Sequence, residues 1–530
     1  MSSAARPPAR FALSAGLFLR LLAVVHLVAF ASAWTQLAGL IGPHGLLPAQ
    51  PFFDAVRTQL GPAAARDELP SLCWWFGATT FLPVLCATGI ALSLLLFAGI
   101  APAPALVGLW ACYLSLCGAG QVFFNFQWDS LLLETTLLAV FLAPWKLLPL
   151  WRPHEPPPLA RLLLVWLLFR LMLVSGAVKL LSGDPAWRDL TALTFHYETQ
   201  PLPTPLAYWA HQLPAWLQRA ACAGLFAIEL LVPFFFFAPR GLRHRAALLT
   251  AALMLLIALT GNYTFFNFLT AALCVLLLDD TLLARLLPPR FPPAISHLLN
   301  DKRPGTAPFP LSSAPPKQLC HLLDDITPPA PPSAPASNPP PARRPRWPLR
   351  LFAAFVFAYT TLDTLPVFFR HLGPVPGFNA LSAALAPYRS FNRYGLFAVM
   401  TNPRPELVFE GSDDARTWLA YDFPYKPGDL ARAPTWVAPH QPRLDWQLWF
   451  AALGPPAQNP WVLTLAEHFL RGTPEVLALV AKNPFAARPP RYVRVVRYEY
   501  HFTDSATRAA TGQIWRRAPF DFYLLPAALR

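Results

Sequence analysis

Nine apolar stretches, each about as long as a helix that crosses a bilayer, dominate this chain up to residue 369. Such a helix needs roughly 17–25 predominantly apolar residues. Hydrophobic residues make up 55% of the sequence and charged residues only 13%, whereas a soluble domain is about 25% charged. Too few polar groups remain to cover so much apolar surface in water. We therefore expect a polytopic α-helical membrane bundle of about nine transmembrane helices, near residues 12–33, 78–100, 103–119, 130–149, 160–181, 219–238, 244–260, 265–283 and 349–369.

The first stretch also has features of a secretory signal peptide. Arg6 and Arg10 form a basic leader, and residues 31–33 (Ala-Ser-Ala) fit a small-residue cleavage site. Arg20 and His26 interrupt the apolar run, which is otherwise long enough to span. We expect an uncleaved first span, with cleavage as the alternative.

Basic residues near the ends of the stretches predict which loops face the cytoplasm, because cytoplasmic loops are enriched in Lys and Arg. If the N-terminus is cytoplasmic, the basic loops near 146–161, 240–245 and 285–350 all lie inside. These loops account for most of the formal charge of +14, so we expect no nucleic-acid partner. An odd number of spans places the C-terminal part outside the cytoplasm. Only residues 261–264 separate the seventh and eighth stretches, and one kinked segment there would reverse that side.

Changes in composition divide the chain into four parts. Residues 1–287 are the transmembrane bundle, and residues 288–348 contain nineteen prolines, which favours an extended cytoplasmic linker. An SH3-type ligand is the functional alternative for that linker. Residues 349–373 form the last transmembrane helix, and residues 374–530 form a soluble domain outside the cytoplasm.

The soluble part reads as a small mainly-β domain with helical insertions that folds on its own. Residues 406–410, 418–423 and 496–502 have extended patterns, the last alternating with the period of two that marks a half-buried strand. Residues 513–516 are the expected partner of that last strand. Residues 444–453 have helical spacing, and 461–481 contain more helix. Five arginines in this part fit either an anion site or, as we expect, a solvated face: Arg389, Arg393, Arg443, Arg491 and Arg494.

Ionisable side chains at membrane depth are the candidate functional residues, because such groups are costly and are paired or functional. No metalloprotease, nucleophile-elbow, dinucleotide or P-loop motif is present, and no CxxC or metal-ligand spacing occurs. We expect Arg170 and Lys179 to pair with carboxylates and fix the bundle; a proton-transfer or substrate role is the alternative. The candidate buried charged network is Asp129, Glu134, Arg170, Lys179 and Glu229.

Residues 182–205, called here the lid segment, follow Lys179 and are dense in polar and aromatic groups. We expect them to form either a structured lid over the bundle or a partner-binding surface. The residues singled out are Asp184, Trp187, Arg188, His196, Tyr197 and Glu198.

A series of motifs follows in order along the chain: residues 39–48 (GLIGPHGLLP), 125–134, 175–205, 260–263 (TGNY), 392–397 (NRYGLF), 410–414, 425–429 and 439–447. With these motifs, the chain resembles the lipase maturation factor family over nearly its whole length. The resemblance implies an endoplasmic-reticulum membrane protein that secreted lipases need in order to fold and assemble. It implies a chaperone-like role rather than catalysis, and no cofactor.

A weaker resemblance covers part of the membrane half. Residues 176–187 are similar to the membrane domain of the vitamin K-dependent carboxylase and its bacterial relatives. That resemblance implies a candidate catalytic base at Lys179 and, as the alternative function, a membrane-embedded quinone-linked or lipid-modifying enzyme.

The expected location is a membrane across which proteins are exported. Arginine outnumbers lysine, and both alanine and proline are abundant. This composition is typical of a bacterial genome and favours the bacterial inner membrane. A eukaryotic chain would reside in the endoplasmic reticulum. The expected partners are the lipid bilayer and an exported lipase or other hydrolase.

Overall fold

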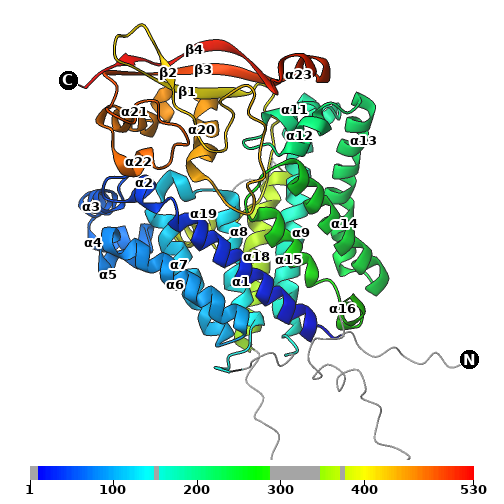
Figure 1. The fold of residues 1–530 in the computed structure, drawn as a ribbon. Coiled ribbons are helices and arrows are strands. Elements are labelled where there is room, and N and C mark those ends of the chain that lie inside the picture. The colour runs from blue at the N-terminus through cyan, green and yellow to red at the C-terminus, as the bar shows by residue number, and fades with distance from the viewer. Residues whose placement is uncertain (1–9, 149–153, 287–346, 370–375, 530) are drawn as a thin grey trace, which may run out of the picture.

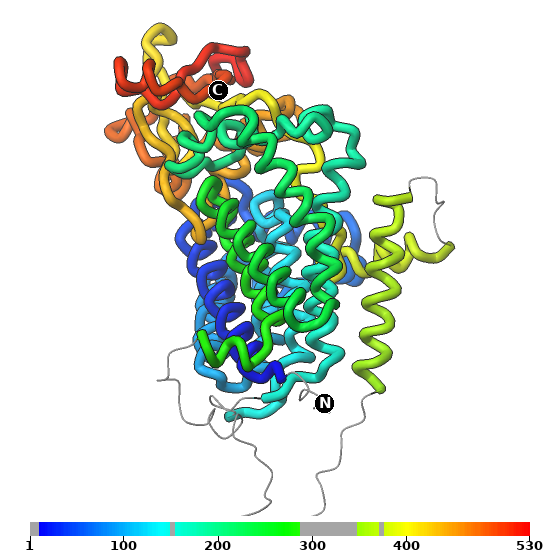
Figure 2. The backbone as a smooth tube through the Cα atoms, turned by 90° about the vertical axis from the view of Figure 1, so that its right-hand side faces the viewer, coloured from blue at the N-terminus to red at the C-terminus, as the bar shows by residue number. Residues whose placement is uncertain are grey.

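The computed structural model describes residues 10–148, 154–286, 347–369 and 376–529 (Figure 1). Apart from its last two residues, the proline-rich 288–348 segment lies outside these ranges, so its predicted linker character stays a prediction. The described chain forms a bundle of long helices with a small sheet at one end (Figures 1 and 2).

The bundle is built from the apolar stretches that the sequence marks as spans, which confirms the predicted fold class. Within the described ranges, seven helices are long and apolar enough to cross a membrane, or eight if a bent helix pair counts as one span. The seven are α1 (Ala12–Trp34), α6 (Ala78–Ala98), α7 (Pro102–Ala119), α9 (Pro158–Leu181), α13 with its continuation to η3 (Ala215–Phe237), α14 (Arg240–Thr260) and α18 (Trp347–Phe368).

The two remaining predicted spans are helical but depart from a full-length span. Helix α8 (Gln127–Leu142) has 16 residues, about 24 Å at 1.5 Å per residue, against a hydrocarbon core of ~30 Å. It ends before Pro144, which cannot continue a helix. Helix α15 (Phe266–Val275) is followed after a bend of 116° by α16 (Asp280–Leu286). The broken pair lies where the sequence left the span count open.

The ends of the bundle differ. Figures 1 and 2 show the starts of α1 and α18 at the end of the bundle opposite the sheet. Asp280, at the start of α16, accepts hydrogen bonds of 2.9 Å from the backbone N–H groups of Ala12 and Leu13, so α16 lies there too. The chain therefore starts α1 and α18 at one end and continues into the sheet at the other, as an odd number of crossings requires.

The sheet is antiparallel and has the strand order β2-β1-β3-β4. Its strands are β1 (Pro405–Ser412), β2 (Leu419–Ala420), β3 (Tyr492–Phe502) and β4 (Trp515–Ala527). Val408 lies opposite Val496, and β4 pairs with β3 from Trp515 opposite Phe502 onward. The pairing predicted for residues 496–502 and 513–516 is therefore confirmed.

Helices cover one face of the sheet. Helix α20 (Arg443–Leu453) contacts β1, and α21 (Trp461–Arg471) contacts β3. This confirms the predicted helices after residues 444 and 461. The apolar side chains of Leu407, Phe409 and Val495 belong to the core that these helices share with the sheet. The rest of this part comprises α19 (Phe378–Leu385), α22 (Pro474–Leu477) and α23 (Ser505–Thr511).

Short helices lie between the bundle and the sheet. The lid segment contains α10 (Pro185–Arg188) and α11 (Ala192–Thr199), and α12 (Pro205–His211) follows it. Asp184 caps α10 by accepting a hydrogen bond of 2.9 Å from Ala186 N–H, and Pro185 occupies the first helical position, which Pro favours. Further short helices follow the first span: α2 (Leu37–Ile41), α3 (Ala49–Leu60), α4 (Pro62–Glu68) and α5 (Cys73–Phe76).

One apolar core runs from the bundle into the helices beneath the sheet. Leu131 of α8 and Leu448 of α20 belong to the same cluster of buried side chains. Trp446 of α20 packs against Trp128 of the bundle with ring centroids 4.8 Å apart. That residues 374–530 fold on their own stays a prediction; in the full chain, part of their apolar surface packs against the bundle.

Candidate functional site at the junction of bundle and sheet

The five charged residues predicted at membrane depth occupy three separate sites rather than one network. Arg170 pairs with Glu134, Lys179 pairs with Glu229, and Asp129 pairs with Arg443 of the C-terminal part. Each of the six side chains is less than a tenth exposed. A buried charge is tolerated when it is paired and hydrogen-bonded, and each site meets this condition.

Asp129 lies in the first turn of α8 and holds the start of α20. Its carboxylate accepts hydrogen bonds of 2.6 Å from the Tyr113 hydroxyl and 3.0 Å from Arg443 Nη2. Arg443 also donates to the Phe123 carbonyl, and its guanidinium lies 3.4 Å from the centroid of the Phe124 ring. The Asp129–Arg443 pair therefore joins α8 to α20 across the junction.

Arg443 was expected on a solvated face, and this expectation is wrong. The residue is 1% exposed. In the sequence it looks like a surface arginine because it stands among polar residues at the start of a helix. Its partner is 314 residues away in the chain, so only the tertiary structure shows why it is buried.

Glu134 receives hydrogen bonds from both halves of the chain. Arg170 of α9 donates to it from within the bundle. From the C-terminal part, Asn392 N–H donates at 3.0 Å and the Tyr394 hydroxyl at 2.7 Å. Arg170 also donates to the Asn392 carbonyl at 3.0 Å. The Glu134–Arg170 pair thus fixes the segment that leads from α18 to the sheet.

Lys179 and Glu229 form a closed pair between α9 and the α13 span. The ammonium donates to both carboxylate oxygens, at 2.8 and 2.7 Å. The Lys179 side chain is 4% exposed and that of Glu229 is 7% exposed. The ammonium also lies 5.5 Å from the centroid of the Trp187 ring. A general base must lie within reach of substrate, whereas the Lys179 ammonium is covered and bonded to Glu229.

The start of the lid segment is bonded to the C-terminal part. Asp184 accepts a hydrogen bond from Met400 N–H. Trp187 is 2% exposed, and its indole N–H donates to the Phe397 carbonyl at 2.9 Å. Arg188, by contrast, is exposed.

The end of the lid segment lies under the last two strands. Glu198 is buried and accepts a hydrogen bond of 2.8 Å from Phe502 N–H, and His501 Nδ1 lies 3.2 Å from it. Tyr197 is half-buried and packs against the apolar clusters on either side of it. The lid segment is thus clamped between bundle and sheet.

His196 faces the turn between α14 and α15. Its Nε2 lies 3.2 Å from the Tyr263 hydroxyl, and the two rings stack. Burial first, and the nearby positive charge of Lys179 second, lower the pKa of His196 from 6.5 to about 4. The imidazole is therefore neutral at pH 7.

Two further polar clusters tie the sheet to the lid segment and the bundle. Their residues Asn262 and Lys426 lie in the family motifs, whereas no such motif contains Arg404 or Glu406. Arg404 is fully buried and donates to backbone carbonyls of the lid segment, among them Pro201 at 2.9 Å, and to Glu406 at 2.9 Å. Lys426 completes this cluster with an ion pair of 3.0 Å to Glu406.

Asn262 forms the other cluster. Its side-chain N–H donates to the Thr435 carbonyl at 2.8 Å, and its side-chain oxygen accepts from the N–H groups of Val437 and Ala438 at 2.8 and 3.0 Å. Asn262 also fits a glycosylation sequon, but its side chain is buried and fully bonded, so it serves here as an anchor.

These contacts form a junction that fixes the C-terminal part on the membrane bundle. We define the junction by the Asp129–Arg443, Glu134–Asn392 and Asn262–Val437 contacts. In the described part of the chain, no group of three or more His, Cys, Asp or Glu residues could hold a metal ion. The contacts at the junction position one part of the protein on another: they hold the sheet at one end of the membrane bundle.

Comparison with known proteins gives the family. The model of the lipase maturation factor transmembrane domain matches residues 13–285, and that of the lipase maturation factor C-terminal domain matches residues 390–525. The chain belongs to the lipase maturation factor family. Human lipase maturation factor 2 is 39% identical over 94% of this chain and 80% of its own length. Bovine lipase maturation factor 1 is 33% identical over 96% of this chain and 88% of its own length.

The family match covers both sides of the junction. The transmembrane model contains Asp129 and Glu134, and the C-terminal model contains Arg443 and Asn392. The two family domains therefore meet through buried polar contacts in this chain. No solved structure matches it.

Proposed function

We propose that this chain is an integral membrane maturation factor that assists the folding of an exported lipase. The observation that carries the proposal is the match of both family domains in order, together with relatives named lipase maturation factors. The junction supports it, because buried ion pairs hold the C-terminal part at the end of the bundle and hydrogen bonds join the lid segment to the sheet.

We further propose that the sheet end faces the compartment into which proteins are exported. The starts of α1 and α18 lie at the other end, and Arg240 and Arg243 beside α16 are bonded there to Asp279. Cytoplasmic loops are enriched in such basic residues. The relatives are vertebrate proteins, which fits the endoplasmic reticulum; a bacterial inner membrane stays the prediction from composition. Reporter fusions after residues 320 and 420 test this, since both on one side would contradict it.

The client surface that we propose is the outer edge of β4. This strand lies at the end of the strand order, and its outer edge pairs with no strand in the described ranges. Phe520, Phe522 and Leu525 are 64%, 52% and 66% exposed on it. An open edge with exposed apolar side chains can take up another extended chain, which is what a folding client offers.

The test is lipase maturation in cells that lack their own maturation factor. The full chain should restore the secreted activity of a co-expressed lipase. A Phe520→Ser/Phe522→Ser variant should lose most of this rescue at unchanged protein level. The matched control is Leu419→Ser, since Leu419 is 47% exposed at the other edge of the sheet. Full rescue by the β4 variant would overturn the client surface, and no rescue by the folded wild type would overturn the function.

A further inference from the structure

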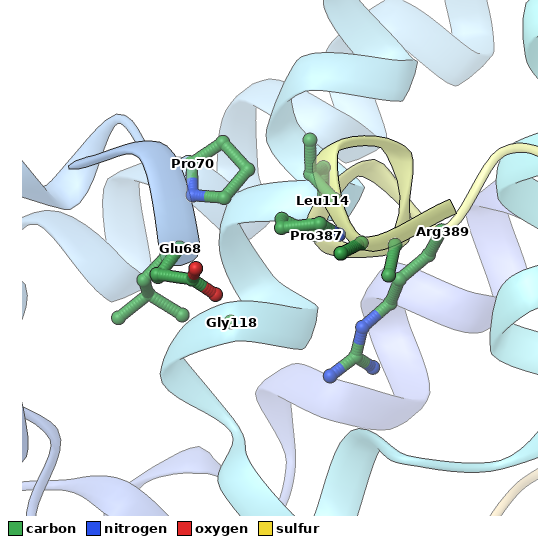
Figure 3. Close-up of a pocket in the computed structure, with 9 residues that line it drawn as sticks. Glu68, Pro70, Leu114, Gly118, Pro387 and Arg389 are labelled. Atoms are coloured by element: carbon green, nitrogen blue, oxygen red, sulfur yellow. The ribbon is translucent and has the colours of Figure 1, made fainter. Parts of the chain in front are cut away.

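A cleft lies beside the sheet end of the bundle, between α4, α7 and α19. It has a volume of about 380 Å³, within the range of roughly 300–1,000 Å³ that small-molecule sites occupy. Figure 3 shows the side chains that line it, among them Glu68, Pro70, Leu114, Gly118, Pro387 and Arg389.

Two opposite charges face each other across this cleft. In Figure 3, the carboxylate of Glu68 and the guanidinium of Arg389 lie on opposite sides of the cleft. Arg389 Nη1 donates to the Phe124 carbonyl at 2.8 Å, which fixes the guanidinium in place. Within the described ranges, Glu68 has no hydrogen-bond or ion-pair partner and Arg389 has no carboxylate partner. An unpaired carboxylate and a guanidinium without a carboxylate partner, on opposite sides of a cleft, suit a ligand that carries both a positive and a negative group.

The backbone of Arg389 is held in an uncommon conformation. Its φ of 48° is in the left-handed region, which a residue with a Cβ rarely adopts. The neighbouring Ser390 is buried and accepts a hydrogen bond of 2.9 Å from the Trp110 indole N–H. The surroundings thus hold Arg389 in the conformation that aims its side chain into the cleft.

The position of the cleft points to a lipid. Gly118 is in the last turn of the membrane helix α7. Trp75 and Phe76, which follow Pro70 closely, are 64% and 61% exposed, as aromatic residues at the level of lipid headgroups are. Apart from the two charges, the lining side chains are Leu, Pro, Ala and Gly.

We propose that this cleft binds the headgroup of phosphatidylethanolamine. Arg389 pairs with the phosphate, for which guanidinium is suited, and Glu68 accepts hydrogen bonds from the primary ammonium. A choline headgroup has no N–H to donate and is bound by aromatic rings, and no aromatic ring lines the cleft. The anionic glycerol and inositol headgroups lack the ammonium that would pair with Glu68. The chemistry recognised is phosphoethanolamine, and its source is the surrounding bilayer.

Native mass spectrometry of the full-length protein in detergent tests this. The protein is stripped of lipid and then mixed with equal amounts of dioleoyl-phosphatidylethanolamine and dioleoyl-phosphatidylcholine. The wild type should show more ethanolamine-lipid adducts. Glu68→Gln should reduce this preference about tenfold, since it removes a charge-assisted hydrogen bond. Asp67→Asn is the matched control, because Asp67 is an exposed carboxylate next to Glu68 that does not line the cleft.

Two further binding measurements test the charge and the source of the ligand. Glu68→Lys should exchange the ethanolamine preference for one toward dioleoyl-phosphatidylglycerol, since the cleft then holds two cations. Free phosphoethanolamine should displace the lipid from the wild type. Equal adducts of both zwitterionic lipids on the wild type, or an unchanged preference in Glu68→Gln, would overturn the proposal. Binding of free phosphoethanolamine without any lipid adduct would overturn the lipid as the source.

Discussion

At the scale of single residues, buried charges that pair across the junction are the feature that connects the two family domains. Asp129 and Glu134 stand on one helix of the bundle, and each is bonded to a residue from beyond position 390. The desolvation of such a pair is costly, so its two members depend on each other more than on their surroundings.

Removing one member of a pair should therefore be far worse than removing both. Arg443→Met leaves Asp129 buried without its cation and should lower the free energy of unfolding by about 3–5 kcal/mol. The double variant Asp129→Leu/Arg443→Met should recover much of that loss. Thermal unfolding of the detergent-solubilised protein measures both. The control is Arg471→Met, whose exposed pair with Glu467 should contribute only about 0–1 kcal/mol. The account is wrong if both arginine variants behave alike.

His196 should make the folded protein less stable at acidic pH, because its pKa is lower in the folded than in the unfolded chain. The folded pKa is about 4 and the ordinary value is 6.5, so below pH 6.5 the unfolded chain binds a proton that the folded chain excludes. Stability from this residue is intact above pH 6.5 and falls by up to about 3 kcal/mol as the pH drops to 4. Unfolding midpoints at pH 7.5 and 5.0 should differ less for His196→Asn than for the wild type. An equal difference in both proteins would refute this role.

The sequence identified both members of two buried ion pairs and one member, Asp129, of the third. Glu134, Arg170, Lys179 and Glu229 are all visible as charges inside apolar stretches, and their mutual pairing follows from the cost of burying a lone charge. Arg443 and Asn392 stand in polar surroundings in the sequence, where burial has no signature. Their roles arise from contacts across more than 250 residues, which no local pattern encodes.

At the scale of elements, the turn between α14 and α15 is a feature that hydropathy alone does not predict. The sequence left open whether residues 261–264 kink one segment or separate two. The structure makes Asn262 the reason for the break, because its amide reaches into the segment before α20 and bonds to Thr435, Val437 and Ala438. The lengths of the apolar stretches predicted α14 and α15. The hydrogen bonds of Asn262 determine where the two helices are separated.

Asn262→Ala should loosen this segment selectively. It removes the partner of the buried Val437 N–H and of the partly buried Ala438 N–H, and an unsatisfied buried group costs about 1–3 kcal/mol. Hydrogen–deuterium exchange should rise at residues 435–440 while exchange in α9 stays unchanged. Asn483→Ala is the control, since the Asn483 side chain bonds within its own turn, to Phe485 N–H. Unchanged exchange at 435–440 would show that the anchor is not needed.

The strands of the sheet were the most predictable elements of the C-terminal part. The alternation at residues 496–502 marks β3, and its predicted partner is the start of β4. The length of β4, which continues to Ala527, was not expected, because Pro519 and Pro526 interrupt its pattern. Register shifts along its pairing with β3 accommodate this irregularity, and bulges of this kind are common at edges.

At the scale of the whole molecule, the membrane bundle is a platform that presents a sheet. In the described part of the chain, seven helices long enough to span form the bundle together with α8 and the broken α15–α16 pair, and the sheet lies at the end opposite the start of α1 (Figures 1 and 2). A shared core and the junction contacts hold the sheet there. Composition predicted the membrane and the soluble part; only the tertiary contacts show that the two are one unit.

The measurement that tests the account most directly is site-specific photo-crosslinking to a newly synthesised lipase. A photoreactive residue replaces Phe522 on the open edge of β4, or Leu248 on the membrane helix α14 as control; both side chains are more than half exposed. The account predicts an adduct with the immature lipase from position 522, its disappearance once the lipase is mature, and none from position 248. Full restoration of lipase activity by the position-522 protein without any adduct would contradict it.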